Sequence, residues 1–74
     1  MRVFENANYW ELTDICIGQF ITIGKRKEVY KVIDYAKHWN DNGMYDRIMV
    51  VTDSNNRYKV FKCASLVGKR VTVY

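Results

Sequence analysis

The middle of the chain is typical of a β-hairpin. An apolar, β-branched run at 48–52 is followed by four polar turn-forming residues at 53–56, and a second β-rich run follows at 57–63. Two such runs joined by Asp, Ser and Asn residues pair as antiparallel strands. This hairpin predicts the class of the protein, a small β-rich domain, and leaves its activity open.

Three further segments also favour extended structure. They are rich in β-branched residues and Tyr, and the first of them alternates in period two between Gly18 and Gly24. Val32-Ile33 interrupts the alternation of the second segment, which predicts a bulge or a strong bend. The five predicted strands are 19–24, 28–36, 45–52, 57–63 and 70–74.

The connections between these strands carry their own signals. Residues 37–44 form the longest polar connection, and its Asn42-Gly43 step suits a tight turn with positive φ. Residues 64–68 predict a short helical turn before the last strand. Residues 1–14 give no clear pattern, so we expect irregular structure there with at most one helical turn. A chain of 74 residues has room for one domain, so residues 1–74 are predicted to form a single unit.

Five strands with tight hairpins in the middle and a helical turn before a short last strand resemble the SH3-like small β-barrels. That group includes Tudor-like, KOW-like and Sm-like domains. The resemblance covers roughly residues 15–74 and implies an all-β fold, a small, partly open, five-stranded barrel. It rests on strand order and spacing, so it assigns no functional residue. The OB-fold is the alternative, although its strands are usually longer and a helix separates its later strands.

The sequence offers few residues for catalysis or for metal binding. The single histidine, His38, follows a predicted strand in a polar connection. The two cysteines, Cys16 and Cys63, lie in separate apolar stretches, so we expect two buried free thiols, with one bridge between them as the alternative. One His and two separated Cys supply at most three zinc ligands. We therefore expect no enzyme activity, no metal and no cofactor.

Charge and aromatic content favour binding to nucleic acid. The formal net charge is +4, and residues 57–74 contain no Asp or Glu. Small β-barrels bind single strands by combining a basic groove with aromatic side chains on which bases stack. The candidate phosphate contacts are Lys25, Arg26, Lys27, Lys37, Arg57, Lys59, Lys62, Lys69 and Arg70. The candidate stacking residues are Tyr35, Trp39, Tyr45 and Tyr58.

A protein target is the alternative partner. Residues 38–40 and 43–45 place Trp39, Tyr45 and Met44 around one turn, and such residues are typical interface anchors. This pattern suits a small inhibitor or adaptor of the kind that phages and mobile elements encode. Open strand edges also allow pairing with a partner strand or with a second copy of the chain, as a homodimer. In a third interpretation the charges form a solvated strand face and the aromatic residues pack the barrel.

Two short segments of the chain echo each other. Ile23-Gly24-Lys25-Arg26 resembles Val67-Gly68-Lys69-Arg70, and a second pair of similar segments occurs in a different order. The change of order excludes a tandem repeat, and shared β patterning is sufficient to explain the similarity.

No apolar run has the length of a membrane span or of a secretory signal. We therefore expect a cytoplasmic protein without a membrane partner.

Overall fold

Six antiparallel strands and two short helices make up the computed structural model, which describes residues 1–74. The strands are β1 (Arg2–Phe4), β2 (Phe20–Ile23), β3 (Tyr30–Trp39), β4 (Tyr45–Thr52), β5 (Tyr58–Lys62) and β6 (Val71–Val73). The helices are α1 (Tyr9–Thr13) and α2 (Cys63–Leu66). The strands form one sheet in the order β1-β6-β2-β3-β4-β5, so β1 and β5 are its two edges and the sheet is not closed. The predicted all-β class is confirmed.

The predicted strands all occur, as β2 to β6, and the predicted helical turn before the last strand is α2. The expectation for residues 1–14 is wrong in one respect, because this segment contains the strand β1, whereas α1 is the short helical segment that the expectation allowed. Strand β1 pairs with β6, with Arg2 opposite Val73. A three-residue strand has too little pattern of its own to be recognised, and it exists because a partner from the far end of the chain is available.

Helix α1 begins with a capping box. The side chain of Asn8 accepts a hydrogen bond from the Glu11 N–H at 2.8 Å, and the Glu11 carboxylate accepts one from the Asn8 N–H at 3.0 Å. These bonds satisfy two of the N–H groups that a helix start leaves unpaired. Leu12 is the buried residue of this helix, so packing on the core holds a helix too short to be stable alone.

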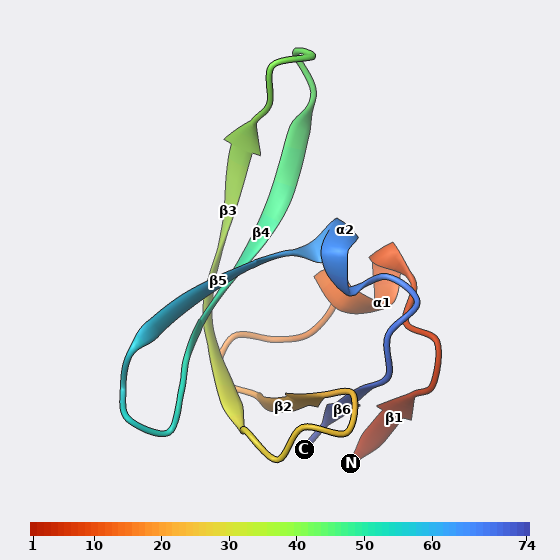
Figure 1. The fold of residues 1–74 in the computed structure, drawn as a ribbon, viewed down its shortest axis with the longest axis vertical. Helices are drawn as coiled ribbons and strands as arrows, with labels where there is room; N and C mark the ends of the chain where they lie inside the picture. The colour runs from red at the N-terminus through yellow and green to blue at the C-terminus, as the bar shows by residue number, and fades with distance from the viewer.

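The core lies between the sheet and the two helices. Figure 1 shows β3 and β4 as a long hairpin that extends beyond the rest of the molecule, while β2, β6 and β1 lie across its other end. Helix α2 contacts α1, β4 and β5. The buried core residues are Ala7, Leu12, Ile15, Ile21, Ile23, Tyr30, Val32, Met49, Val51, Cys63, Leu66, Val71 and Val73. Neither helix has the length and apolar character of a membrane-spanning segment.

The predicted irregularity in the second strand is a bulge in β3. Val32 pairs with Val51 and Asp34 pairs with Val50, so Ile33 is the extra residue on β3. Because side chains alternate along a strand, one extra residue exchanges the two faces of everything that follows. After the bulge the odd-numbered residues of β3 share the inner face with Met49, which is buried and lies opposite Tyr35.

Two expectations about single residues are wrong. His38 does not lie in a polar connection, because β3 continues through Trp39 and the connection is limited to residues 40–44. Cys63 is a buried free thiol as expected, but Cys16 is a free thiol that is exposed. Cys16 follows the buried Ile15 in the turn that ends at Gly18, and there the chain points its side chain outward.

Candidate functional site

The two echoing Gly-Lys-Arg segments meet at one end of the sheet. Ile23 at the end of β2 pairs with Val71 at the start of β6, so the residues beyond these ends lie side by side. The Gly24 N–H donates to the Arg70 carbonyl at 2.7 Å. Gly24 and Gly68 have φ of 62° and 85°, a region that favours glycine. The four cations that these turns bring together are Lys25, Arg26, Lys69 and Arg70.

A cleft of about 370 Å³ lies at these turns, and we call it the basic cleft. The four cations of the two turns contribute to its lining, and Tyr30, Phe61 and Leu66 contribute apolar surface. No Asp or Glu lines it. The basic cleft is therefore a positively charged hollow with a hydrophobic floor.

A fifth cation lies beside the floor of the basic cleft. Tyr30 and Phe61 pack edge to face, with ring centroids 5.2 Å apart. The Lys59 ammonium lies 5.5 Å from the centroid of the Tyr30 ring, within range of a cation–π contact. Lys59 thus lies near the cleft through its contact with Tyr30.

One acidic residue approaches the cations of the basic cleft. Arg70 Nε lies 3.6 Å from a carboxylate oxygen of Glu5, and both side chains are exposed. An exposed ion pair of this kind is weak and is screened by salt. Lys25, Arg26 and Lys69 form no ion pair. The cleft therefore keeps a positive potential that attracts anions.

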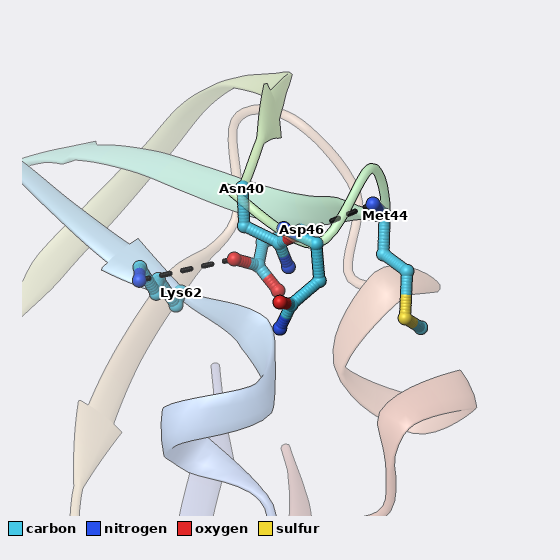
Figure 2. A network of polar contacts seen from close by, with 5 residues as sticks. Asn40, Met44, Asp46 and Lys62 are labelled. Atoms are coloured by element: carbon cyan, nitrogen blue, oxygen red, sulfur yellow. Dashed lines mark hydrogen bonds and ion pairs between the residues drawn. The ribbon is translucent and has the colours of Figure 1, made fainter.

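Several predicted contacts lie elsewhere. Lys62 points to Asp46, with 3.8 Å between the ammonium and the carboxylate, as Figure 2 shows. Arg57 belongs to the turn before β5, Lys27 does not line the basic cleft, and Tyr58 is exposed on β5. Because these residues do not converge on one place, they do not extend the cleft.

The hairpin of β3 and β4 forms a second candidate surface. Trp39 lies directly opposite Tyr45, and their rings pack edge to face at 5.5 Å between centroids. The Lys37 ammonium lies 4.9 Å from the centroid of the Tyr45 ring. Figure 2 shows the adjoining tip, where the Asn40 side chain accepts a hydrogen bond from the Met44 N–H at 3.2 Å. The structure thus brings Lys37, Trp39 and Tyr45 together, as the sequence predicts.

Tyr35 lies on the same hairpin, farther from its turn than Lys37 and Trp39, and is half-buried. Its hydroxyl shares its single proton between the carbonyls of Leu12 at 3.0 Å and Ile15 at 2.7 Å. Burial raises the pKa of Tyr35 to about 12, so the hydroxyl stays protonated and remains a donor. The position of Tyr35 suits a role in holding α1 to the sheet better than a role in base stacking.

Sequence reasoning misses one residue of this surface, Arg47. It lies directly opposite Lys37, its guanidinium lies 5.0 Å from the centroid of the Tyr35 ring, and its buried Nε has no hydrogen-bond partner. The only signal in the sequence is the spacing of Tyr45 and Arg47, which mirrors that of Lys37 and Trp39 across the turn. That symmetry has meaning only when the register is known.

His38 is exposed, and no group of three or more His, Cys, Asp or Glu side chains is placed to hold a metal ion.

Comparison with known proteins gives no relative from which a role can be transferred. No protein-family model matches the chain, and neither a curated protein nor a solved structure is significantly similar to it.

Proposed function

We propose that this protein is a non-enzymatic module that binds nucleic acid, with the basic cleft as the site for the phosphate backbone. The observation that supports this most strongly is the convergence of two Gly-Lys-Arg turns from distant parts of the chain. Their four cations line one cleft that no acidic side chain lines. A polyanion with regularly spaced charges is the ligand that such an arrangement fits best.

The chemistry of the lining residues also supports this proposal. Arg26 and Arg70 carry planar guanidinium groups that can bind phosphate oxygens through two parallel hydrogen bonds. Lys25 and Lys69 add point charges, and the hydroxyl of Ser65 on the same lining is a further donor. All of these contacts recognise the backbone, so they predict binding with little dependence on sequence.

We also propose that the fold is an SH3-like small barrel. The sheet is open at β1 and β5, its strands β2 to β5 follow one another as hairpins, and α2 precedes the short strand β6. These features support the resemblance without assigning a family. Two elements lie outside this resemblance. Strand β1 extends the sheet at one edge, and α1 packs on the core through Leu12.

Charge reversal in the basic cleft tests the proposed function. The double variant Lys25→Glu/Arg26→Glu is expected to lose at least about tenfold in affinity for labelled single-stranded and duplex DNA at low salt, because phosphate contacts dominate such binding. Equilibrium binding by fluorescence anisotropy measures the loss. Circular dichroism checks that the variant is folded.

The matched control places the same charge change elsewhere. Arg2→Glu/Lys31→Glu also lowers the formal charge from +4 to 0, and neither residue lines the basic cleft. If the two double variants lose affinity equally, the net charge rather than the cleft is responsible. That result, or the absence of any binding by the wild type, contradicts the proposal.

The end of the hairpin supports a second candidate function, docking to a protein target as an inhibitor or adaptor. Met44, Trp39 and Tyr45 are exposed by 67%, 66% and 47% at one end of the molecule. Large exposed aromatic residues beside a methionine are typical interface anchors. Pull-down from a cell extract tests this candidate. A specific target is expected to be captured by the wild type and not by Trp39→Ala.

A further inference from the structure

We propose that the inner face of the β3–β4 hairpin is a platform for single-stranded nucleic acid, with a base stacked on Trp39 and a neighbouring phosphate bound by Lys37 and Arg47. This inference rests on the proposed function and adds to it a class of ligand and a second site. We call the four residues Lys37, Trp39, Tyr45 and Arg47 the hairpin platform.

The bulge in β3 creates the hairpin platform. Because Ile33 is the extra residue, Lys37 and Trp39 follow Tyr35 on the inner face. Their partners in register are Arg47 and Tyr45. Two layers follow each other along the hairpin, a cationic pair and then an aromatic pair, and none of the four residues belongs to the buried core.

The cationic layer lacks a counter-charge. Lys37 and Arg47 are direct cross-strand neighbours, and like charges in that position are unfavourable. Neither residue forms an ion pair. The Arg47 Nε is buried without a hydrogen-bond partner, which is costly for a charged donor. An anion bound by both residues removes the repulsion and neutralises the charge of the guanidinium.

The space for that anion is present beside the cationic layer. A hollow of about 190 Å³ is lined by Tyr35, Ala36, Lys37 and Arg47. None of these side chains is acidic, so the hollow favours an anion. A phosphate group suits it, because phosphate offers several acceptor oxygens to the guanidinium and the ammonium at once.

The aromatic layer presents one ring for stacking. Tyr45 is engaged on two sides, by the Lys37 ammonium and by the Trp39 ring. Trp39 is two-thirds exposed, at 66%, although it is a large apolar side chain. Tyr45 therefore fixes the position of Trp39, and Trp39 offers the free aromatic surface on which a base can stack.

The combination of the two layers selects a single strand. In a duplex the faces of the bases are covered by their neighbours, and only phosphates and groove edges are accessible. In a single strand a base and its adjacent phosphate are both free, and aromatic stacking is tolerant of sequence. We therefore expect the hairpin platform to bind single strands of DNA or RNA with little preference between bases.

Fluorescence of Trp39 tests this inference directly. The chain has two tryptophans, and Trp10→Phe leaves Trp39 as the only one. In this variant, oligothymidine and oligouridine of about a dozen nucleotides are expected to quench the fluorescence, whereas a DNA duplex of the same length is not. The DNA and RNA arms show which single strand is bound more tightly.

Affinity measurements on two alanine variants complete the test. Trp39→Ala is expected to weaken single-strand binding about 10- to 100-fold and to leave duplex binding unchanged. Tyr58→Ala removes another exposed aromatic residue, on β5, and is expected to change neither. Lys37→Gln is expected to make the slope of log affinity for single strands against log salt shallower, by the equivalent of about one phosphate contact. Lys31→Gln is expected to leave that slope unchanged.

The outcomes separate this inference from the proposed function. If Trp39→Ala binds single strands as tightly as the wild type while Lys25→Glu/Arg26→Glu does not, the hairpin platform is wrong and the basic cleft stands. If the wild type captures a protein that Trp39→Ala does not, with nucleic-acid affinity unchanged, the hairpin is a protein interface instead. If the wild type binds neither single strand nor duplex at low salt, both proposals fail.

Discussion

The Tyr35 hydroxyl is the clearest tie between the sheet and the N-terminal part of the chain. Its single proton is shared between the carbonyls of Leu12 and Ile15, which lie at the end of α1 and just beyond it. Both carbonyls belong to buried residues, and the Leu12 carbonyl also accepts a backbone hydrogen bond from Ile15 at 3.5 Å. The side chain of Tyr35 therefore fixes α1 on β3.

Removal of the Tyr35 hydroxyl is expected to destabilise the protein. Tyr35→Phe leaves the buried Ile15 carbonyl without its donor, whereas the Leu12 carbonyl keeps the Ile15 N–H, and the loss costs about 1–3 kcal/mol of the free energy of unfolding. Urea unfolding measures the loss. Tyr58→Phe is the matched control, because the hydroxyl of Tyr58 makes no hydrogen bond within the protein and the residue is exposed. Equal stability of wild type and Tyr35→Phe would contradict this role.

The raised pKa of Tyr35 gives the same bond a pH signature. Burial favours the neutral hydroxyl in the folded state, where its pKa is about 12 against an ordinary 10.0. The unfolded chain therefore releases this proton first, and the wild type loses stability as the pH rises from about 10 toward 12. Tyr35→Phe lacks this contribution, so its stability is expected to decline less over that window. A decline of equal size in both proteins would show that another group is responsible.

The Asp53 carboxylate organises the turn between β4 and β5. Its Oδ1 accepts hydrogen bonds from the N–H groups of Asn55 at 2.8 Å and Arg57 at 2.9 Å. The bond from Arg57, followed by the bond from Asn55, lowers the pKa of Asp53 below its ordinary value. The charged form is thus the one that holds the turn.

Stability is expected to depend on the Asp53 charge in acid. A lowered pKa in the folded state adds stability above the ordinary pKa of the group, and this is lost as the pH falls through the lowered pKa. The difference in unfolding free energy between wild type and Asp53→Ala is therefore expected to be largest near neutral pH and to shrink in acid. Asp41→Ala, in the other hairpin turn, is the control. A difference that does not change with pH would refute the account.

At the scale of elements, the capping box of α1 explains why a helix of only five residues forms and why it begins directly after Asn8. Asn8→Ala is expected to lower the free energy of unfolding by about 1 kcal/mol, because it removes the acceptor for the Glu11 N–H. Asn8→Ser keeps an acceptor and is expected to retain most of the stability. Chemical denaturation of both variants checks this, and an equal loss in both would contradict a capping role.

The elements differ in how far the sequence predicts them. Strands β2 to β6 and α2 follow from local signals, namely alternation of apolar residues and turn-forming Gly, Asn and Asp. Even the bulge at Val32-Ile33 is visible as a break in the pattern. Strand β1 is not predictable in this way, because it depends on Val73 and its neighbours at the opposite end of the chain.

The candidate sites also combine residues that the sequence predicts with residues that only the tertiary structure identifies. The cations of the basic cleft are all predicted from the sequence, but only within a larger set of basic residues. What selects Lys25 and Lys69 over Lys62 is tertiary structure, since the first two lie on turns joined by β2 and β6, while Lys62 lies beside Asp46. Arg47 is missed because its importance comes from its register with Lys37.

At the scale of the whole molecule, the fold separates two surfaces and gives each its own chemistry. The basic cleft lies where the turns at the ends of β2 and β6 meet, and the hairpin platform lies on the β3–β4 hairpin, which extends away from the body as Figure 1 shows. The cleft offers charge, and the hairpin offers an aromatic ring beside charge. In our account both surfaces serve one ligand, a nucleic-acid strand.

The salt dependence of binding is the most direct test of this account. If the four cations of the basic cleft each neutralise one phosphate, log affinity for a single strand falls linearly with log salt, with a slope of about −3 from the cleft alone. The account predicts a slope at least this steep for the wild type and a clearly shallower one for Lys25→Glu/Arg26→Glu. Affinity that does not change with salt, or no binding at low salt, would contradict it.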